Sequence, residues 1–317
     1  GVGDIIMMHI LKAQQFDRDC LNELFDTTLA LESQPTDRPI SSFLSKPTIM
    51  ASLFYEPSTR TRFSFESAML KLGGNILSTE NAQEFSSAAK GEILEDTIRV
   101  VSEYSDVIIL RHSEEGAAER AASVSSVPII NAGDGAGQHP TQSLIDLYTI
   151  KKECSEIDGK RIALIGDLSH GRTIHSLAYM LTKYEIEHLY LVAPDFVQMK
   201  PELIKHLDEH GVSWSACNRL KDIASEVDVF YQTRLQKERF RTGSFEIFEE
   251  YQKIAHRYKI DGSILKMMKP DARILHPLPR LGEIAIAVDS DPRAAYFRQA
   301  RNGLYIRMAL LLKVLHS

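Results

Sequence analysis

Short apolar runs alternate along this chain with longer segments in which apolar residues recur every three or four positions. Short apolar runs are typical of strands buried in a parallel sheet, and the longer spacing is typical of helices that cover such a sheet. The predicted strands are Ile49–Phe54, Val107–Leu110, Ile129–Asn131, Ile162–Ile165, Leu189–Val192, Val229–Tyr231 and Ile274–Leu275. The predicted helices are Asp17–Glu32, Thr59–Leu72, Ile93–Tyr104, Ala117–Val124, Thr141–Lys152, Thr173–Lys183, Pro201–His210, Ile247–Tyr258 and Arg293–Leu315.

This alternation predicts an α/β fold with two domains, each a mostly parallel sheet flanked by helices. A polar segment, Lys152–Lys160, separates two halves of ordinary domain size. A second break falls near Asp289–Pro292, and the helix predicted after it is long enough to pack back on the first domain. We therefore predict one domain from residues 1–151 and 293–317, and another from residues 152–292.

Composition narrows the class of protein. The chain has 317 residues, 44% of them hydrophobic and 25% charged, which is the balance of a soluble globular protein. Its formal net charge is -6, and no long Lys/Arg run or membrane-length apolar run is present, so we expect neither nucleic acid nor membrane as a partner. Three scattered cysteines without a Cys-x-x-Cys pair favour a reducing compartment and argue against a structural zinc.

An acidic protein that binds an anion must concentrate positive charge locally, and Ser58-Thr59-Arg60-Thr61-Arg62 does so where a predicted strand meets a predicted helix. Ser58 is a candidate N-cap, and the amides and dipole of a helix start attract an anion. The hydroxyls and the Arg60 guanidinium add donors suited to phosphate oxygens. In isolation these residues would favour a capped helix with surface arginines, but the strand–loop–helix context favours a phosphate site.

The same five residues resemble the carbamoyl phosphate signature of the aspartate/ornithine carbamoyltransferase family. Three further segments resemble that family in the same order, each at the end of a predicted strand: Leu110-Arg111-His112, His139-Pro140-Thr141-Gln142 and His276-Pro277-Leu278-Pro279-Arg280. The resemblance spans nearly the whole chain. It implies that residues 1–151 and 293–317 form a carbamoyl phosphate-binding domain and that residues 152–292 bind the amino acceptor.

The acceptor half resembles the aspartate enzymes of the family. Pro277 stands where the ornithine enzymes carry Cys, and their Ser-Met-Gly loop is absent. The segments around Arg172 and Arg234 also resemble aspartate enzymes, and a pair of arginines suits two carboxylates but would repel ornithine. The resemblance therefore implies an aspartate-binding domain and a transfer of the carbamoyl group to L-aspartate, a step of pyrimidine and UMP biosynthesis.

The resemblance also implies roles for individual residues. The predicted carbamoyl phosphate ligands are Ser58, Thr59, Arg60, Thr61, Ser86, Lys90, Arg111, His139, Gln142, Pro277 and Leu278. The predicted aspartate ligands are Lys90, Arg172, Arg234, Gln236 and Leu278, and the residues with a catalytic role are Arg60, Thr61, Lys90, Arg111 and His139. No metal or cofactor is implied. We expect Arg62, His112, His276 and Arg280 to be structural.

The family forms trimers, so the resemblance implies a homotrimer in which Ser86 and Lys90 reach the site of a neighbouring subunit. The segment Glu80–Glu92 resembles plant-type members, which are feedback-inhibited by UMP. We expect a cytoplasmic location, or the plastid stroma if the chain comes from a plant-type source and its transit peptide has been removed.

Three alternatives are open at this point. Ile162–Gly171 is a strand followed by a glycine-containing turn and could bind a dinucleotide, although the Gly-x-Gly-x-x-Gly pattern is absent. A non-catalytic carbamoyltransferase-like subunit that binds ligands is a second alternative. A carbamoyltransferase with another amino acceptor is the third.

Overall fold

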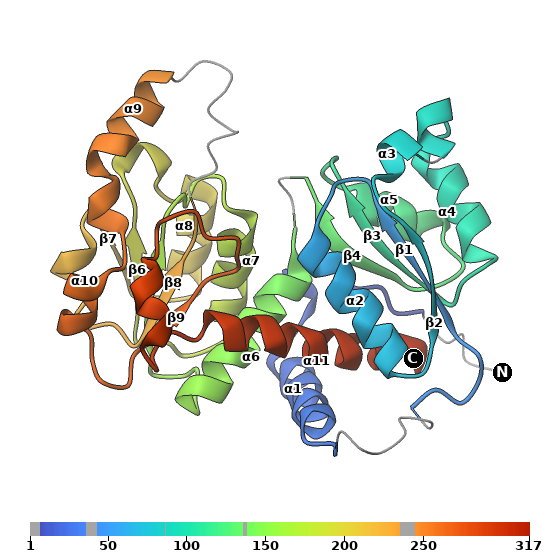
Figure 1. Ribbon diagram of the computed structural model, residues 1–317, viewed down its shortest axis with the longest axis horizontal. Helices are drawn as coiled ribbons and strands as arrows, with labels where there is room; N and C mark the ends of the chain where they lie inside the picture. Colours follow the sequence, from blue (N-terminus) through green and yellow to red (C-terminus); the bar gives the residue numbers. More distant parts are fainter. Residues whose placement is uncertain (1–6, 36–42, 86, 136–137, 235–244) are drawn as a thin grey trace. The chain divides into compact units, whose positions relative to one another are not determined.

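The computed structural model describes residues 7–35, 43–85, 87–135, 138–234 and 245–317, which form two α/β units (Figure 1). The first unit comprises Gly1–Leu144 and Arg301–Ser317, and the second comprises Ile145–Ala300. Each unit holds one parallel sheet with helices against it, so the predicted fold class is confirmed. No helix in the described ranges is long and apolar enough to cross a membrane.

The sheet of the first unit has the strand order β2-β1-β3-β4. Its strands are β1 (Ile49–Phe54), β2 (Asn75–Thr79), β3 (Val107–His112) and β4 (Ile129–Asp134). The helices of this unit are α1 (Arg18–Glu32), α2 (Thr59–Lys71), α3 (Ala82–Phe85), α4 (Leu94–Ser102) and α5 (Ala117–Val124). Helix α2 contacts β1 and β2, and α5 contacts β3 and β4. The chain runs from β1 outward to β2 and returns to β3, so a topological switch point lies between β1 and β3.

The sheet of the second unit has the strand order β7-β6-β5-β8-β9. Its strands are β5 (Arg161–Ile165), β6 (His188–Val192), β7 (Trp214–Cys217), β8 (Val229–Gln232) and β9 (Arg273–Leu275). Its helices include α7 (Arg172–Leu181), α8 (Pro201–Glu209), α9 (Phe245–Ile254) and α10 (Gly262–Met267). The strands run outward from β5 to β7 and then resume at β8, so the switch point of this sheet lies between β5 and β8.

Two helices belong to both units. Helix α6 (Pro140–Cys154) begins in the first unit and ends in the second, and α11 (Tyr296–Leu315) does the reverse. Within the first unit, the guanidinium of Arg307 on α11 lies over the ring of Phe65 on α2, 4.9 Å from its centroid. This contact fixes the end of α11 on the first unit, as predicted. The divisions at 144/145 and 300/301 fall inside these helices, whereas the sequence placed them at 151/152 and 292/293.

The central strands form the cores because most of their residues are apolar. Strand β1 is buried from its second residue onward, and β5 likewise. Full burial on both faces is the signature of a parallel strand covered by helices. Strands β2 and β7 were not predicted: both lie at a sheet edge and are mostly exposed or half-buried, so their sequences lack a continuous apolar run.

Candidate active site

The loop after β1 brings the predicted phosphate-binding residues to the switch point of the first sheet. Phe54 pairs with Arg111, and the amide of Tyr55 donates to the Arg111 carbonyl oxygen at 2.8 Å. Ser58 occupies the N-cap position of α2, as predicted, and its carbonyl oxygen accepts the amide hydrogen of Arg62 at 3.0 Å. Its hydroxyl makes no capping bond among the described residues. The first-turn amides of α2 have no partner within the helix, which makes this turn an anion-binding feature.

The signature residues differ in exposure. Thr59 and Arg60 are exposed in the first turn of α2, Ser58 is half-buried and Thr61 is buried. The pattern fits a helix start that presents Thr59 and Arg60 outward while Thr61 packs against the protein. Arg62 has a different role: its guanidinium forms ion pairs with Glu66 and Glu80 at 3.4 Å each. The expected structural role of Arg62 is therefore confirmed.

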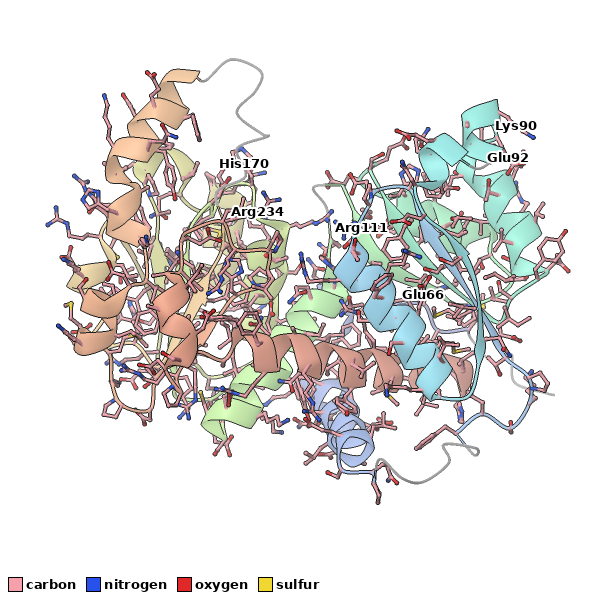
Figure 2. The ribbon with its side chains drawn as sticks, viewed as in Figure 1. Glu66, Lys90, Glu92, Arg111, His170 and Arg234 are labelled. Atoms are coloured by element: carbon pink, nitrogen blue, oxygen red, sulfur yellow. The ribbon has the colours of Figure 1, made fainter. Side chains whose placement is uncertain are left out.

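Arg111 is the last residue but one of β3, at the same edge of the sheet. Its Nη1 donates to the carbonyl oxygen of Ala132 on β4 at 3.1 Å, and its Nε lies 3.7 Å from Oε2 of Glu56. Its side chain is 13% exposed, so the guanidinium is held against the sheet edge and yet reaches the surface (Figure 2). A planar cation held in this way suits oxygen atoms of an anionic ligand.

The neighbouring His112 packs against the loop after β1 and hydrogen-bonds to the loop after β3. Its Nδ1 accepts the amide hydrogen of Glu114 at 3.0 Å, and its ring packs on Tyr55 with centroids 4.7 Å apart. Burial lowers the pKa of His112, so the ring is neutral and the acceptor at Nδ1 is maintained at neutral pH. The expected structural role of His112 is confirmed.

His139 and Gln142 lie at the start of α6, which follows β4. Asp134 fixes this turn: its Oδ1 accepts the amide hydrogen of Gln138 at 2.8 Å, and its Oδ2 accepts that of Gly116 at 3.1 Å. Pro140 is the first residue of α6, a position that needs no amide hydrogen. His139 is 5% exposed and Gln142 is half-buried. The first unit thus brings both near the strand ends that carry Arg111.

Lys90 ends a short 3-10 helix (Ser87–Lys90) before α4, and it is exposed. Figure 2 shows Lys90 well away from Arg111 in the same unit, so the chain does not assemble these two residues into one cluster by itself. Ser86 and Gln236, also predicted site residues, lie outside the described residues.

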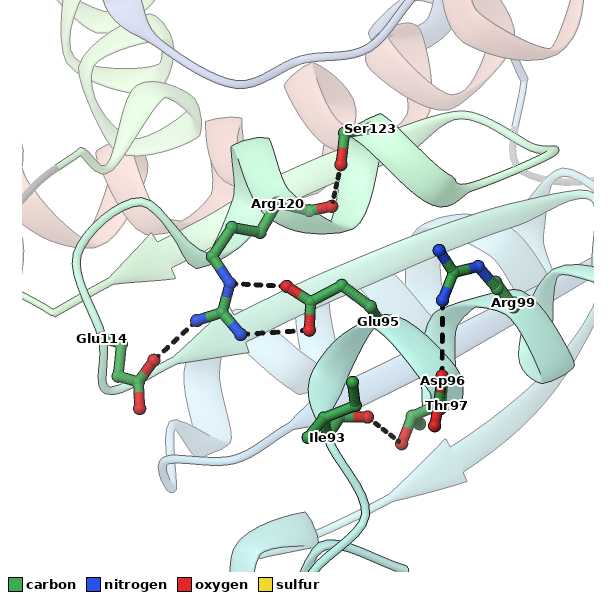
Figure 3. Close-up of polar contacts among 8 residues, drawn as sticks. All are labelled: Ile93, Glu95, Asp96, Thr97, Arg99, Glu114, Arg120 and Ser123. Carbon is green, nitrogen blue, oxygen red and sulfur yellow. Dashed lines mark hydrogen bonds and ion pairs between the residues drawn. The ribbon is translucent and has the colours of Figure 1, made fainter.

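Arg120 on α5 holds the first turn of α4, the helix after Lys90. Its Nε and Nη2 donate to the two oxygens of Glu95 at 2.7 and 3.1 Å, and its Nη1 donates to Glu114 at 2.7 Å (Figure 3). This bidentate contact lowers the pKa of Glu95 to about 2. This ion pair was not predicted from the sequence because its partners, Arg120 and Glu95, are 25 residues apart.

The second unit places its candidate residues at the switch point between β5 and β8. Gly166 follows β5 with a φ of +125°, and a Cβ atom at this position would lie 2.3 Å from Oγ1 of Thr233, which follows β8. The amide and the hydroxyl of Thr233 both donate to the carbonyl oxygen of Ile165, at 2.9 and 2.8 Å. Only glycine fits this close approach. Arg234 is the next residue and is half-buried.

Arg172 begins α7 at the other end of the loop that starts with Gly166, and it is half-buried. The loop is held by Asp167, whose side chain is 1% exposed. Oδ1 of Asp167 accepts the amide hydrogen of His170 at 3.0 Å, and the His170 ring nitrogen Nδ1 lies 3.2 Å from both carboxylate oxygens. Figure 2 shows His170 and Arg234 at this end of the unit. Asp167 and His170 were not predicted as site residues, although their three-residue spacing after a strand was a usable signal.

The loop after β9 lies at the same edge, because β9 pairs with β8. His276 follows β9, and its Nε2 is 2.6 Å from Oε1 of Glu283, while its Nδ1 accepts the amide hydrogen of Leu278 at 2.7 Å. Leu278 has a φ of +59°. Arg280 forms an ion pair with Asp289 and stacks on the ring of Tyr296, which confirms its expected structural role. Within the described residues no cluster of His, Cys, Asp and Glu could hold a metal ion.

The comparisons with known proteins identify the family. Residues 8–152 match the aspartate/ornithine carbamoyltransferase carbamoyl-P binding domain, and residues 158–314 match the Asp/Orn binding domain of the same family. The chain therefore belongs to the aspartate/ornithine carbamoyltransferase family.

Within this family, several similar proteins are named aspartate carbamoyltransferases. A chloroplastic aspartate carbamoyltransferase 3 of Pisum sativum is 55% identical over 302 residues, which is 95% of this chain and 76% of that protein. An aspartate carbamoyltransferase catalytic subunit of Methanothrix thermoacetophila is 48% identical over 98% of both chains. The solved catalytic subunit of M. jannaschii aspartate transcarbamoylase is 43% identical over 98% of both chains, with a TM-score of 0.89. A Trypanosoma cruzi aspartate transcarbamoylase solved with carbamoyl aspartate and phosphate is 40% identical, covers 96% of this chain and 94% of that one, and has a TM-score of 0.85.

Proposed function

We propose that this chain transfers the carbamoyl group of carbamoyl phosphate to the amino group of L-aspartate, which gives N-carbamoyl-L-aspartate and phosphate. The observation that carries the proposal is a pair of arginines at the carboxyl edge of each sheet: Arg60 with Arg111 in the first unit, and Arg172 with Arg234 in the second. Two anionic substrates need two such cationic sites. Relatives named aspartate carbamoyltransferases, and a relative solved with carbamoyl aspartate and phosphate, support the same reaction.

In the proposed reaction the neutral amine of aspartate attacks the carbamoyl carbon, a C–N bond forms and the carbonyl oxygen becomes negative. The tetrahedral intermediate then collapses, the C–O bond to phosphate breaks, and the nitrogen proton passes to the leaving phosphate. Arg111 and His139 would donate to the carbonyl oxygen as its charge develops, and Gln142 would bind the carbamoyl amide. No covalent enzyme intermediate is needed, because positioning and charge stabilisation supply the rate.

The remaining predicted ligands hold the substrates around this reacting centre. Ser58, Thr59, Arg60 and Thr61 would bind the phosphate through hydroxyls, first-turn amides and the guanidinium. Arg172, Arg234 and Gln236 would bind the aspartate carboxylates. The main chain of Pro277 and Leu278 would orient the carbamoyl and amino groups.

Lys90 suggests that the complete site needs a second copy of the chain. We propose a homotrimer in which Ser86 and Lys90 reach the neighbouring subunit; the exposed position of Lys90, away from Arg111, supports this arrangement. The test mixes two inactive variants, Lys90→Ala and Arg60→Ala, after reversible dissociation. Hybrid trimers should regain activity because some sites combine two intact halves, whereas a site built from one chain would stay inactive.

Feedback inhibition by UMP is a second proposal about the same site. It rests on the plant relatives and on the segment before Lys90, and it requires the UMP phosphate to compete for the residues around Arg60. Initial-rate measurements should show that UMP raises the KM for carbamoyl phosphate; an unchanged KM would contradict the proposal. The location stays a prediction: the plastid stroma for a plant-type source, since the plant relatives are chloroplastic, and otherwise the cytoplasm.

The decisive test of the reaction supplies carbamoyl phosphate with L-aspartate or with L-ornithine and measures carbamoylated product and phosphate. Product should form with aspartate alone and be lost in Arg60→Ala and in Arg234→Ala. Arg99→Ala is the matched control, because Arg99 is an exposed arginine of α4 and forms an ion pair at 3.3 Å with Asp96 in the same helix. Product with another acceptor would keep the phosphate site and overturn the assignment of the second unit. Absence of any product would favour a non-catalytic subunit.

A further inference from the structure

His276 is held at three atoms and is almost completely buried. Its side chain is 1% exposed. Its amide donates to Oε1 of Gln299 at 2.8 Å, its Nδ1 accepts the amide hydrogen of Leu278 at 2.7 Å, and its Nε2 lies 2.6 Å from Oε1 of Glu283. A ring fixed at its main chain and at both nitrogens has one orientation.

These contacts also fix the tautomer. The Leu278 amide can only donate, so Nδ1 of His276 must be unprotonated. The ring hydrogen is then on Nε2 and points at the Glu283 carboxylate, whose Oε2 accepts the amide hydrogen of Leu281 at 2.9 Å. Burial raises the pKa of Glu283, but the hydrogen bonds from the His276 ring and from the Leu281 amide outweigh it, so the net pKa is lowered and the carboxylate is an acceptor. Glu283 therefore selects the form of His276 that can hold Leu278.

The anchor continues into the core of the second unit. The side chain of Gln299 accepts the amide hydrogen of His276 and donates from Nε2 to Oδ1 of Asp146 at 2.7 Å. The hydroxyl of Tyr231 donates to Oδ2 of the same carboxylate at 2.6 Å. Asp146 and Tyr231 are fully buried, and Gln299 is 1% exposed. A satisfied buried network of this kind is rigid, so it gives the loop after β9 a fixed base.

These contacts hold the main chain of Leu278 in an uncommon conformation. A φ of +59° is rarely adopted by a residue with a branched side chain, and such conformations persist only where the surroundings enforce them. Leu278 follows β9, and β9 pairs with β8, whose end carries Arg234. An amine nucleophile beside a dicarboxylate site needs an uncharged acceptor to orient its hydrogens, and a main-chain carbonyl oxygen is such an acceptor.

We propose that His276, oriented by Glu283, is a positioning residue that sets the Leu278 main chain to recognise the amino group of the acceptor. This inference rests on the proposed function and goes beyond the expectation that His276 is structural. It predicts that His276 contributes to binding of the amino group of aspartate. It predicts no contribution to binding of the two carboxylates, which are assigned to the arginines. Succinate separates the two, because it has both carboxylates and no amino group.

Two substitutions test the two ring contacts of His276 separately, because each keeps one contact and removes the other. In His276→Asn the Oδ1 atom stands as many bonds from Cα as Nδ1 does, so it can accept from Leu278 but cannot reach Glu283. In His276→Gln the terminal amide reaches as far as Nε2, so Glu283 keeps a partner while Leu278 loses its acceptor. We expect His276→Gln to raise the KM for aspartate about tenfold, the effect of losing one hydrogen bond, and to change the inhibition constant of succinate less than about twofold. His276→Asn should have the smaller effect on aspartate.

Each outcome decides the question. Equal losses for aspartate and succinate in His276→Gln, or no loss of either, would overturn the proposal, and so would a larger aspartate effect in His276→Asn. If His276→Gln does not fold, Glu283→Gln carries the test. It keeps the His276 ring, but the single oxygen of the glutamine side chain cannot replace both carboxylate oxygens, one of which accepts from the His276 ring and the other from the Leu281 amide. A wild-type protein that makes no carbamoyl aspartate would instead refute the proposed function, and the inference with it.

Discussion

Replacing Gly166 with alanine tests whether the close approach of β5 and β8 organises the acceptor half of the site. The added Cβ would lie 2.3 Å from Oγ1 and 2.8 Å from the carbonyl oxygen of Thr233. The second of these atoms is main chain and cannot rotate away. Gly166 also has a φ of +125°, which a residue with a Cβ rarely adopts. The two costs are separate and should add.

The structure sets the magnitude. An unfavourable positive φ costs about 1–3 kcal/mol, and overpacking in a tight site costs about 1–3 kcal/mol more. Gly159→Ala is the matched control, because Gly159 has a φ of +75° in the turn before β5 and no atom within 4 Å of an added Cβ. The control carries the cost of a positive φ without the packing cost, and its φ lies nearer to the left-handed region that residues with a Cβ adopt. The difference between the two variants should therefore be at least about 1 kcal/mol, and Gly166→Ala should be the less stable.

Urea unfolding of both variants beside the wild type measures this difference. Kinetics supply an independent measurement: Thr233 must shift to admit the Cβ, and Arg234 follows it directly, so Gly166→Ala should raise the KM for aspartate more than the KM for carbamoyl phosphate. Equal losses of stability in the two variants would refute the packing argument. An aspartate KM that stays at the wild-type value would refute the link from Gly166 to Arg234.

Replacing Arg111 with lysine should lower kcat/KM for carbamoyl phosphate about a hundredfold, because an ammonium group lacks the planar fork of a guanidinium. The control is Arg99→Lys at an exposed position of α4. Equal kcat/KM values for the two variants would contradict the prediction. Tyr231→Phe removes a donor from the buried Asp146 and should destabilise the protein by about 1–3 kcal/mol in chemical unfolding; burial raises the pKa of Tyr231, so no alkaline step near pH 10 should precede unfolding. Arg120→Gln should cost less than about 1 kcal/mol at pH 7 because the pair is partly exposed. That difference should shrink as the pH falls from the ordinary Glu95 pKa of 4.5 toward about 2, since the lowered pKa means the stabilisation is lost on protonation; a constant difference would argue against the ion pair.

The sequence predicted the buried strands and the residues at their ends for a physical reason. A strand covered on both faces must be apolar along its length, so β1 was predicted with its observed bounds, Ile49–Phe54. The polar residues after it belong to the loop and to the first turn of α2, which has its own helix-start signals. Local rules therefore located Ser58 and Arg60 without any knowledge of the pairing.

Pairing itself depends on contacts that local patterns do not encode. The order β2-β1-β3-β4 places Arg111 beside the loop after β1, although about 50 residues separate them in the chain. The pattern of apolar residues does not predict which strands will pair. The edge strand β7 reads Trp-Ser-Ala-Cys and resembles a loop, because one of its sides has no sheet neighbour. The contact between His276 and Glu283 was missed for a related reason: a loop with a left-handed residue brings them together, and its shape follows from the hydrogen bonds themselves.

The proposed arginine ligands would explain how a chain with a net charge of -6 binds two anionic substrates. A guanidinium on a free loop would lose much conformational freedom on binding, and that entropy would oppose the contact. Here Arg60 and Arg172 lie in the first turns of helices, and Arg111 lies in a strand with its Nη1 already bound to the Ala132 carbonyl oxygen at 3.1 Å. Charge held in this way needs little reorganisation when an oxygen becomes negative in the transition state, which is the condition for electrostatic catalysis. It follows that the anchor matters as well as the charge, and that a lysine at position 111 should lose more rate than its unchanged charge would suggest.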